Sequence, residues 1–380
     1  MRIAQVTYST KPRGGVVHTL ALSEALAALG HDVEIWTLGR GDDTAFFREV
    51  DPAVAVRVVP FETRDGEEIG ARIERSISTM SEAFSSEADI VHAQDCISAN
   101  AVIAAGRACV RTIHHLDAFT TPRLIECHER AIHEPVARIC VSRAVAAEVA
   151  LEYGYDATVI PNGVDAERFI AAAGVAGEAE RDRWRTQLGG YVLALGGIEP
   201  RKGSIDLLEA FARVRAKHPD LRLVFGGGET LFDYRPYREE FDRRAAELGL
   251  QPTILGTLPD DDVPPLVAAA RALGFVSTKE GFGLAAMEAL AAGVPVVARD
   301  LLVLREVFGV TVSYAHDVAG IAAAIERVID LGGAHDPQPG RRLAASYTWD
   351  AAARAHDAFY EDLLNAEGSH GAAVDFIDHH

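Results

Sequence analysis

Short apolar runs alternate with amphipathic stretches along most of the chain, which is the pattern of parallel α/β architecture. In the first half, residues 3–8 form an apolar run that predicts a strand. Apolar residues then repeat at helical spacing from Val16 to Leu29, and Gly30 marks the end of that predicted helix. The other strands predicted in this half are 33–37, 53–59, 89–92, 109–113, 137–141 and 158–160.

A second series of the same kind begins at residue 191. Its predicted strands are 191–195, 221–225, 253–255, 273–276 and 294–298. Its predicted helices are 204–217, 237–248, 263–272 and 282–292. Residues 171–188 lie between the two series, are rich in Ala, Glu and Arg and have no strand pattern, so we interpret them as a linker.

The two series predict an α/β protein with two doubly wound, Rossmann-like domains, residues 1–170 and 189–345. Right-handed crossovers bring the carboxyl ends of the parallel strands to one edge of each sheet. If the two edges face each other, they enclose a deep cleft, which is where such folds bind ligands.

Composition and charge narrow the function classes. The 380 residues are enough for two domains, and 48% hydrophobic with 24% charged residues is typical of a globular protein. The formal net charge of −19 repels nucleic acid and anionic lipid, so we expect no nucleic-acid partner and no stable membrane anchor. The N-terminus reads as a strand and not as a signal peptide, and the cysteines lack C-x-x-C spacing. We therefore expect a cytoplasmic enzyme with reduced thiols.

The densest chemical signal is residues 280–290, EGFGLAAMEAL, directly after a predicted strand. Gly281 and Gly283 allow a close backbone approach at a helix start, where free N–H groups suit a phosphate. Glu280 and Glu288 flank that position, and their carboxylates suit the hydroxyls of a transferred hexose and of a ribose. The alternative is a surface helix with a glycine-rich entry and two solvated glutamates.

This motif resembles the donor site of retaining GT-B glycosyltransferases of family four, and four other segments match that family in order. The matching segments are 14–15 with 30–33, 160–165 (IPNGVD), 196–203 (GGIEPRKG), 280–289 and 347–349 (YTW). The resemblance covers residues 1 to about 364. It implies the GT-B fold, a helix at 346–364 that returns to the first domain, and transfer of a hexosyl group from a nucleotide-diphosphate sugar without metal or other cofactor. The polar residues 365–380 we expect to form a mobile tail.

The resemblance also implies roles for single residues. Glu288 would hold the ribose and Glu280 the transferred sugar, while Lys202 would neutralise the departing diphosphate. The residues expected to offer backbone donors to the diphosphate or sugar are Gly281, Phe282 and Gly283. The alternative for Lys202 is a solvated turn residue.

One position departs from the family, which usually has an arginine where this chain has Gly197. That arginine partners the lysine on the phosphates, so its absence puts a two-cation clamp in doubt. The candidate replacements are Arg201, next to Lys202, and Arg13 or Arg143 from the first domain.

Two adjacent histidines, His114 and His115, end a predicted strand of the first domain. The family has a histidine near the sugar ring, and His114 aligns with it, although the sequence does not separate the two firmly. A metal site with Cys127, His128 and His133 is the alternative, but their spacing is irregular.

Other candidates have structural explanations of similar weight. Gly14 and Gly15 follow the first predicted strand. One interpretation is that they approach a phosphate, and the alternative is that they only form a tight turn. His92 and Asp95 line the cleft or form a buried polar pair at a strand end. The acidic run 260–262 precedes a helix, so N-terminal capping explains it better than a metal.

Competing functions are a GT-B epimerase or phosphorylase, and a nucleotide-sugar-binding protein without activity. The chain lacks the G-x-G-x-x-G fingerprint of dinucleotide-dependent oxidoreductases, which argues against that class. The sequence leaves the donor nucleotide, the sugar and the acceptor open, and it favours a soluble acceptor slightly over a lipid.

Overall fold

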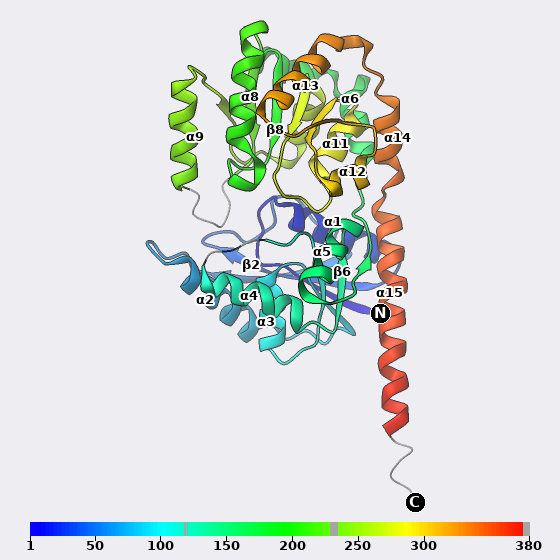
Figure 1. Ribbon diagram of the computed structural model, residues 1–380. Helices are drawn as coiled ribbons and strands as arrows, with labels where there is room; N and C mark the ends of the chain where they lie inside the picture. The colour runs from blue at the N-terminus through cyan, green and yellow to red at the C-terminus, as the bar shows by residue number, and fades with distance from the viewer. Residues whose placement is uncertain (118, 120, 229–234, 375–380) are drawn as a thin grey trace, which may run out of the picture.

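The computed structural model describes residues 1–117, 119, 121–228 and 235–374. Its ribbon forms two lobes, one above the other, and the C-terminal helices run along one side of both (Figure 1).

The first lobe is built on a seven-stranded sheet with the order β3-β2-β1-β4-β5-β6-β7, and every pairing in it is parallel. Its strands are β1 (Arg2–Val6), β2 (Asp32–Arg40), β3 (Val54–Phe61), β4 (Ile90–Ala93), β5 (Val110–Ile113), β6 (Ala137–Cys140) and β7 (Thr158–Val159). Its helices are α1 (Gly14–Ala28), α2 (Ile69–Ala83), α3 (Cys96–Ala104), α4 (Pro122–His133) and α5 (Arg143–Tyr153).

Helices cover both faces of this sheet because successive side chains of a strand point to opposite faces. In β1, Ile3 belongs to a core that includes Leu20 of α1, while Ala4 and Val6 belong to a core that includes Met80 of α2. The sheet is therefore doubly wound, as the sequence predicts.

The second lobe has a six-stranded parallel sheet with the order β10-β9-β8-β11-β12-β13. Its strands are β8 (Tyr191–Leu195), β9 (Arg222–Gly226), β10 (Thr253–Ile254), β11 (Ala272–Phe275), β12 (Val296–Arg299) and β13 (Ser313–Ala315). Its helices are α8 (Ser204–Lys217), α9 (Arg235–Glu247), α10 (Val263–Ala269), α11 (Leu284–Ala292), α12 (Leu302–Phe308) and α13 (Val318–Leu331), with short turns η2 (Pro200–Lys202), η3 (Asp260–Asp262) and η4 (Gly332–Ala334). The prediction of two doubly wound parallel sheets is confirmed.

The predicted linker is helical and packs into the second lobe. It contains the end of α6 (Ala166–Ala173) and all of η1 (Val175–Gly177) and α7 (Glu178–Leu188). Trp184 and Leu188 of α7 are buried in one core with Tyr191 of β8 and Leu266 of α10. These apolar positions are too widely spaced to form a strand pattern, but on a helix they fall on one buried face.

The chain then returns to the first lobe through α14 (Gln338–Ser346) and α15 (Trp349–Val374), as Figure 1 shows in orange and red. Ala353 and Tyr360 of α15 are buried in the core of the first sheet with Ile3 and Leu20. The helix runs to Val374, beyond the expected end at residue 364. Residues 375–380 of the expected tail lie outside the described part of the chain.

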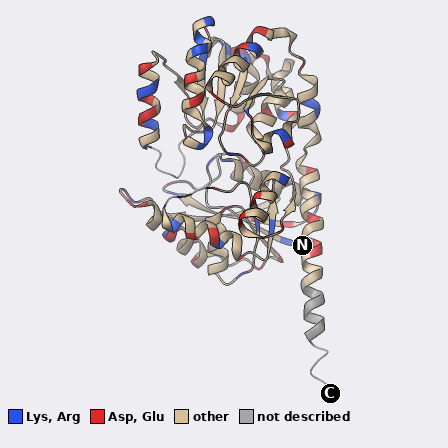
Figure 2. Ribbon diagram, viewed as in Figure 1, with Lys and Arg blue, Asp and Glu red and all other residues tan. Residues whose placement is uncertain are grey.

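Charge is well mixed on the outer helices. Figure 2 shows acidic and basic residues interspersed along α9, which packs on α8 through the buried Phe241. Within the described ranges, none of the helices combines the length and apolar character that crossing a bilayer requires.

Candidate active site

Lys202 and Glu280 form a largely buried ion pair at the carboxyl edge of the second sheet. Lys202 ends η2, just after β8, and Glu280 follows β11. Nζ of Lys202 lies 2.7 Å from Oε1 of Glu280, and Nη1 of Arg201 lies 3.3 Å from the same oxygen. The side chains of Lys202 and Glu280 are only 22% and 10% exposed, so solvent screens this pair weakly.

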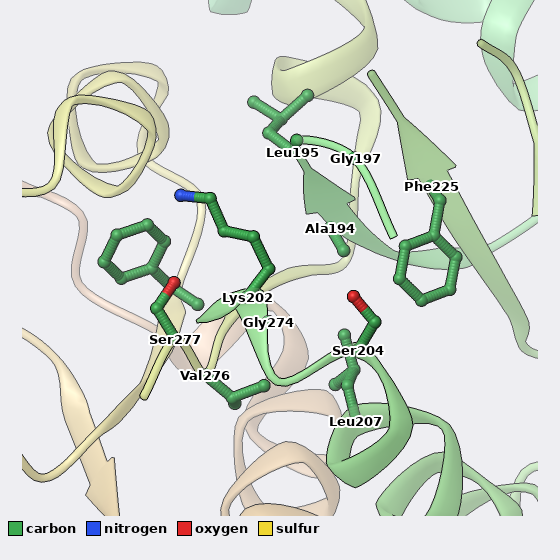
Figure 3. Close-up of a pocket in the computed structure, with 12 residues that line it drawn as sticks. Ala194, Leu195, Gly197, Lys202, Ser204, Leu207, Phe225, Gly274, Val276 and Ser277 are labelled. Atoms are coloured by element: carbon green, nitrogen blue, oxygen red, sulfur yellow. The ribbon is translucent and has the colours of Figure 1, made fainter. Parts of the chain in front are cut away.

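A hollow opens beside this pair, at the carboxyl ends of β8, β9 and β11. Figure 3 shows the Lys202 ammonium and the Ser277 hydroxyl on the same side of it. The glycine and polar residues that line it are Gly196, Gly197, Lys202, Ser204, Gly274 and Ser277. Doubly wound folds bind ligands at this edge of the sheet.

Glu280 is held as a carboxylate. Burial alone raises the pKa of Glu280, but Lys202, Arg201 and a hydrogen bond from Ser277 outweigh burial and lower the pKa to about 2. An acceptor with two oxygens is therefore available to sugar hydroxyls at any physiological pH.

The two glycines after Glu280 serve different purposes. A Cβ on Gly281 would overlap the backbone carbonyl oxygen of His114, so the backbones of the two domains are in direct contact here. Gly283 has a φ of 103° and is the N-cap of α11, so the helix begins at Leu284, two residues later than predicted. In the first turn of α11, the N–H of Ala286 donates to the carbonyl oxygen of Gly283. The N–H groups of Leu284 and Ala285 precede the first carbonyl that the helix can offer, and a phosphate site requires such groups.

Phe282, between these glycines, points into the protein. Its ring is buried and lies edge-on to Tyr347, with the ring centroids 5.3 Å apart. Only its backbone can serve a ligand, which is consistent with the role that the resemblance implies.

Glu288 lies in the second turn of α11 and differs electrostatically from Glu280. Burial raises the pKa of Glu288 to about 7; Arg168 opposes this shift, while Asp260 and Asp165 add to it. This carboxyl group therefore changes its charge near neutral pH.

His114 lies on the first-domain side of the contact between the two domains, and its imidazole is neutral. Burial, with the neighbouring His18 and Arg111, lowers the pKa of His114 well below 6.5. A Cβ on Gly15 would lie 3.6 Å from its ring, so the glycine turn that starts α1 packs on this histidine; around Gly14 the space is open.

The hydrogen bonds of His114 indicate its tautomer. Its Nε2 lies 3.3 Å from Oε1 of Gln94, while Nε2 of Gln94 donates to Oε1 of Gln5 at 2.8 Å. Because the amide of Gln94 is oriented by Gln5, its oxygen accepts from His114, and Nδ1 of His114 is left as an acceptor.

His115 has a different environment. Its Nε2 lies 3.1 Å from Oδ1 of Asp117. Burial raises the pKa of Asp117, but His115 and the charge of Arg201 lower it overall. The structure thus separates the two histidines: His114 packs on the glycine turn, and His115 pairs with an acid near Arg201.

His92 and Asp95 are structural, as their alternative interpretation proposed. His92 is buried, with Nδ1 2.6 Å from Oη of Tyr360 and Nε2 2.7 Å from Oγ1 of Thr112. Asp95 caps α3 in a reciprocal pair with Ser98.

Of the three candidate replacements for the missing arginine, Arg201 lies beside Glu280. Arg143 is 80% exposed and lies 3.5 Å from Glu306, which also accepts from its backbone N–H, so it joins the domains away from the pair. Arg13 donates to the hydroxyl of Tyr8. An arginine at position 197 would be crowded, because a Cβ there lies 2.7 Å from the carbonyl oxygen of Gly228.

The acidic run 260–262 pairs with arginines and not with helix N–H groups. Asp260 lies 2.7 Å from Arg168, and Asp262 pairs with Arg183. The side chains of η3 make no capping hydrogen bond, so the capping prediction is wrong in its detail. Nor does any group of three His, Cys, Asp or Glu side chains come close enough to hold a metal within the described residues; independence of metals remains a prediction.

Three residues that the sequence did not indicate belong to this site: Ser277, Asp117 and Gln94. Each follows the carboxyl end of a central strand by one to four residues. That position is the signal that could have found them, because polar residues there face the ligand edge of a doubly wound sheet.

Two Rossmann-like domains that meet at their carboxyl edges form the GT-B architecture of glycosyltransferases. Two family models match the chain: Glycosyltransferase Family 4 over residues 12–168 and Glycosyl transferases group 1 over residues 180–338. The chain belongs to this family of glycosyltransferases, which use nucleotide-sugar donors.

Curated relatives match over most of their length. The chain is 29% identical to the glycogen synthase of Mycobacterium tuberculosis H37Rv, covering 100% of this chain and 99% of that protein. It is also 29% identical to the D-inositol 3-phosphate glycosyltransferase of Salinispora arenicola, over 92% of this chain and 89% of that protein.

Solved structures have the same fold. Anabaena HepE in complex with UDP and glucose superposes with a TM-score of 0.72 at 20% identity, covering 95% of this chain and 99% of that chain. Sucrose-phosphate synthase from Thermosynechococcus elongatus superposes with a TM-score of 0.77 at 21% identity, covering 96% and 99%.

Proposed function

We propose that this enzyme transfers a hexosyl group from a nucleoside-diphosphate sugar to a water-soluble acceptor and retains the anomeric configuration. The observation that carries the proposal is the Lys202–Glu280 pair, which lies beside the glycine-capped N-terminus of α11. A cation for a phosphate and a carboxylate for hydroxyls stand together where the phosphate–sugar bond of a donor would lie.

A bound donor would separate Lys202 from Glu280. In transfer, a hydroxyl oxygen of the acceptor bonds to the anomeric carbon, the bond from that carbon to the diphosphate oxygen breaks, and its electron pair leaves with the diphosphate, which can take the hydroxyl proton. Lys202 would stabilise the charge on the leaving group, and a positioned group of this kind contributes about 3–4 kcal/mol. The N-terminus of α11 alone would contribute up to about 2 kcal/mol, so the ammonium is the larger of the two.

The other groups would position the sugar and the ribose. Glu280 would accept from hydroxyls of the transferred sugar, and Glu288 from those of the ribose. His114, neutral and with a free acceptor nitrogen, would hydrogen-bond a sugar hydroxyl without adding charge beside the positive anomeric carbon. Arg201 would share the phosphates with Lys202.

Similar proteins suggest where to begin with substrates. One solved structure with this fold holds UDP and glucose, and another holds UDP-glucose, so a UDP-hexose is the first donor to test. The chain's net charge of −19 disfavours an anionic membrane surface, which supports a water-soluble acceptor.

The test is a panel of UDP-, GDP- and ADP-sugars. We expect one donor at about 100 times its dissociation constant to stabilise the protein by about 2.7 kcal/mol in thermal unfolding. The same donor should release nucleotide only when an acceptor is present, and proton NMR of the product should show the donor's anomeric configuration.

Each competing function gives a different result in this assay. Release without acceptor would indicate an epimerase, release that requires inorganic phosphate a phosphorylase, and stabilisation without any release a binding protein. An inverted product would contradict retention.

A further inference from the structure

Four arginines of the first domain gather at the carboxyl edge of its sheet, whereas the Lys202–Glu280 pair belongs to the second domain. This arginine cluster consists of Arg13, Arg40, Arg72 and Arg75. Arg40 is the last residue of β2, Arg72 and Arg75 lie one turn apart on α2, and Arg13 is the N-cap residue of α1.

Two aromatic rings hold the cluster together. The guanidinium carbon of Arg40 lies 5.7 Å from the ring centroids of both Tyr8 and Phe61. Arg13 lies 5.7 Å from the Tyr8 ring, and Arg75 lies 4.0 Å from the Phe61 ring. Tyr8 comes just after β1 and Phe61 ends β3, so the arginines converge on neighbouring strand ends.

Among the described residues, no acidic side chain neutralises the charge of Arg40. Arg75 is paired with Glu67 through two hydrogen bonds of 2.8 and 2.6 Å. In contrast, Nε and Nη2 of Arg40 are buried and have no hydrogen-bond partner among the described residues. Burial, together with Arg72, Arg13 and Arg75, lowers the pKa of Arg40 to about 10. Burying a cation among other cations costs free energy, which a bound anion would offset.

The two unpartnered nitrogens indicate the shape of that anion. Nε and Nη2 are on the same edge of a guanidinium, and this edge donates two parallel hydrogen bonds to two oxygens of one group. A phosphate has further oxygens for neighbouring guanidiniums and more than one negative charge, whereas a carboxylate has two oxygens and a single charge. The cluster therefore fits a phosphate best.

The cluster is also close to the point of transfer. Arg13 directly precedes the Gly14–Gly15 turn that packs on His114. Its charge also lowers the pKa of Glu199 in the loop after β8 of the second domain, although burial keeps that pKa raised overall. A phosphate at the cluster would thus lie on the first-domain side of the junction, opposite the donor residues.

From this geometry we infer that the acceptor carries a phosphate group, which the arginine cluster binds through Arg40. That the bound molecule is the acceptor rests on the proposed function. That the arginine cluster binds an anion does not depend on it. The phosphate anchors the acceptor and takes no part in bond making; one of the acceptor's hydroxyls forms the new bond.

The site is tested with inorganic phosphate, in a Lys202→Met background that removes the cation of the donor side. Isothermal titration calorimetry should detect phosphate binding, and Arg40→Gln should weaken it about tenfold or more, since a charge-assisted double hydrogen bond is lost. Arg40→Lys, which keeps the charge but not the fork, should weaken it less. The matched control is Arg57→Gln on β3, which removes a guanidinium that is 60% exposed and should leave the affinity unchanged.

Thermal unfolding checks that the variants fold. Arg40→Gln should unfold no earlier than the parent protein, because it removes a buried cation that has no counter-ion in the described part of the chain. Phosphate affinity that is equal in Arg40→Gln and Arg57→Gln, or no phosphate binding at all, overturns the inference. Donor stabilisation and nucleotide release by the wild-type enzyme test the proposed function separately.

The source of the phosphate is decided by two further probes. Glycerol 3-phosphate should displace inorganic phosphate if the group belongs to a soluble acceptor. Cosedimentation with phosphatidylglycerol vesicles, but not with phosphatidylcholine vesicles, would assign it to a lipid headgroup. Arg40→Gln must lose whichever interaction is found, and displacement by uncharged glycerol at the same concentration would contradict a phosphate site.

Discussion

Replacing Lys202 with methionine removes the ammonium 2.7 Å from Glu280 and leaves that carboxylate with Arg201 as its remaining cation. The pKa of Glu280 is lowered from 4.5 to about 2, which corresponds to about 3 kcal/mol of native-state stability. Because the folded pKa is the lower one, this stability is present above pH 4.5 and is lost as the pH falls toward 2. The variant keeps the burial that raises the pKa, so we expect it to lose on the order of 2–3 kcal/mol at pH 7.

Lost stability and lost catalysis can be separated by a second substitution. In Lys202→Met/Glu280→Gln the buried charge is gone, so most of the stability should return in urea unfolding. Turnover should not return, because removing a positioned cation from a transition state costs about 10²–10³ in kcat. The matched control is Lys217→Met, which breaks another 2.6 Å lysine–glutamate pair whose lysine is 68% exposed, and it should change stability by less than about 1 kcal/mol.

The reasoning is refuted if the double variant regains the activity of the wild type, since Lys202 would then be only a counter-ion. It is equally refuted if Lys202→Met turns over within about threefold of wild type.

Further outcomes are expected for three variants. The pKa of Glu288 is raised to about 7, so donor affinity in isothermal titration should increase from pH 6 to pH 8 in wild type and stay weak and flat in Glu288→Gln; the same rise in wild type and variant would remove Glu288 from the donor site. Because the pKa of Glu288 in the folded protein is above its ordinary value of 4.5, the stability of the wild type relative to Glu288→Gln should fall as the pH rises from 5 to 7. Gly197→Arg, which restores the usual family residue, should destabilise the protein by about 1–3 kcal/mol in thermal unfolding, since a Cβ there lies 2.7 Å from the Gly228 carbonyl oxygen; unchanged stability would show that the loop yields. Tyr360→Phe removes the hydroxyl 2.6 Å from His92 and should cost about 1–3 kcal/mol in urea unfolding, whereas a neutral effect would mean that another group takes its place.

The fold could be predicted from sequence because most of its central strands are buried on both faces. Such strands are short runs of apolar residues, and β8 and α8 have the predicted bounds 191–195 and 204–217. The start of α11 was predicted two residues early, because the left-handed conformation of Gly283 ends the loop there, and apolar spacing carries no information on φ. The end of α6 and all of α7 were interpreted as a linker, because the polar composition of residues 171–188 hides the buried face around Trp184.

The site was only partly readable, because its essential contacts join distant parts of the chain. Lys202 and Glu280 were predicted as residues, but their direct pairing depends on how η2 and the loop after β11 meet. The overlap that a side chain at Gly281 would make with His114 depends on how the two domains dock, and no local pattern reports it. The arginine cluster was missed for the same reason: Arg40 is an ordinary strand-end residue until the fold places Tyr8 and Phe61 beside it.

The central claim is that the donor's diphosphate binds where α11 begins, within reach of Lys202. A crystal structure with an intact UDP-hexose, or with UDP if the sugar is lost, tests it most directly. We predict a β-phosphate oxygen about 3 Å from Nζ of Lys202 and from a backbone N–H at the start of α11, with Lys202 drawn away from Glu280. A nucleotide bound at another edge of the sheets, or one that leaves the 2.7 Å Lys202–Glu280 contact intact and untouched, would contradict the account.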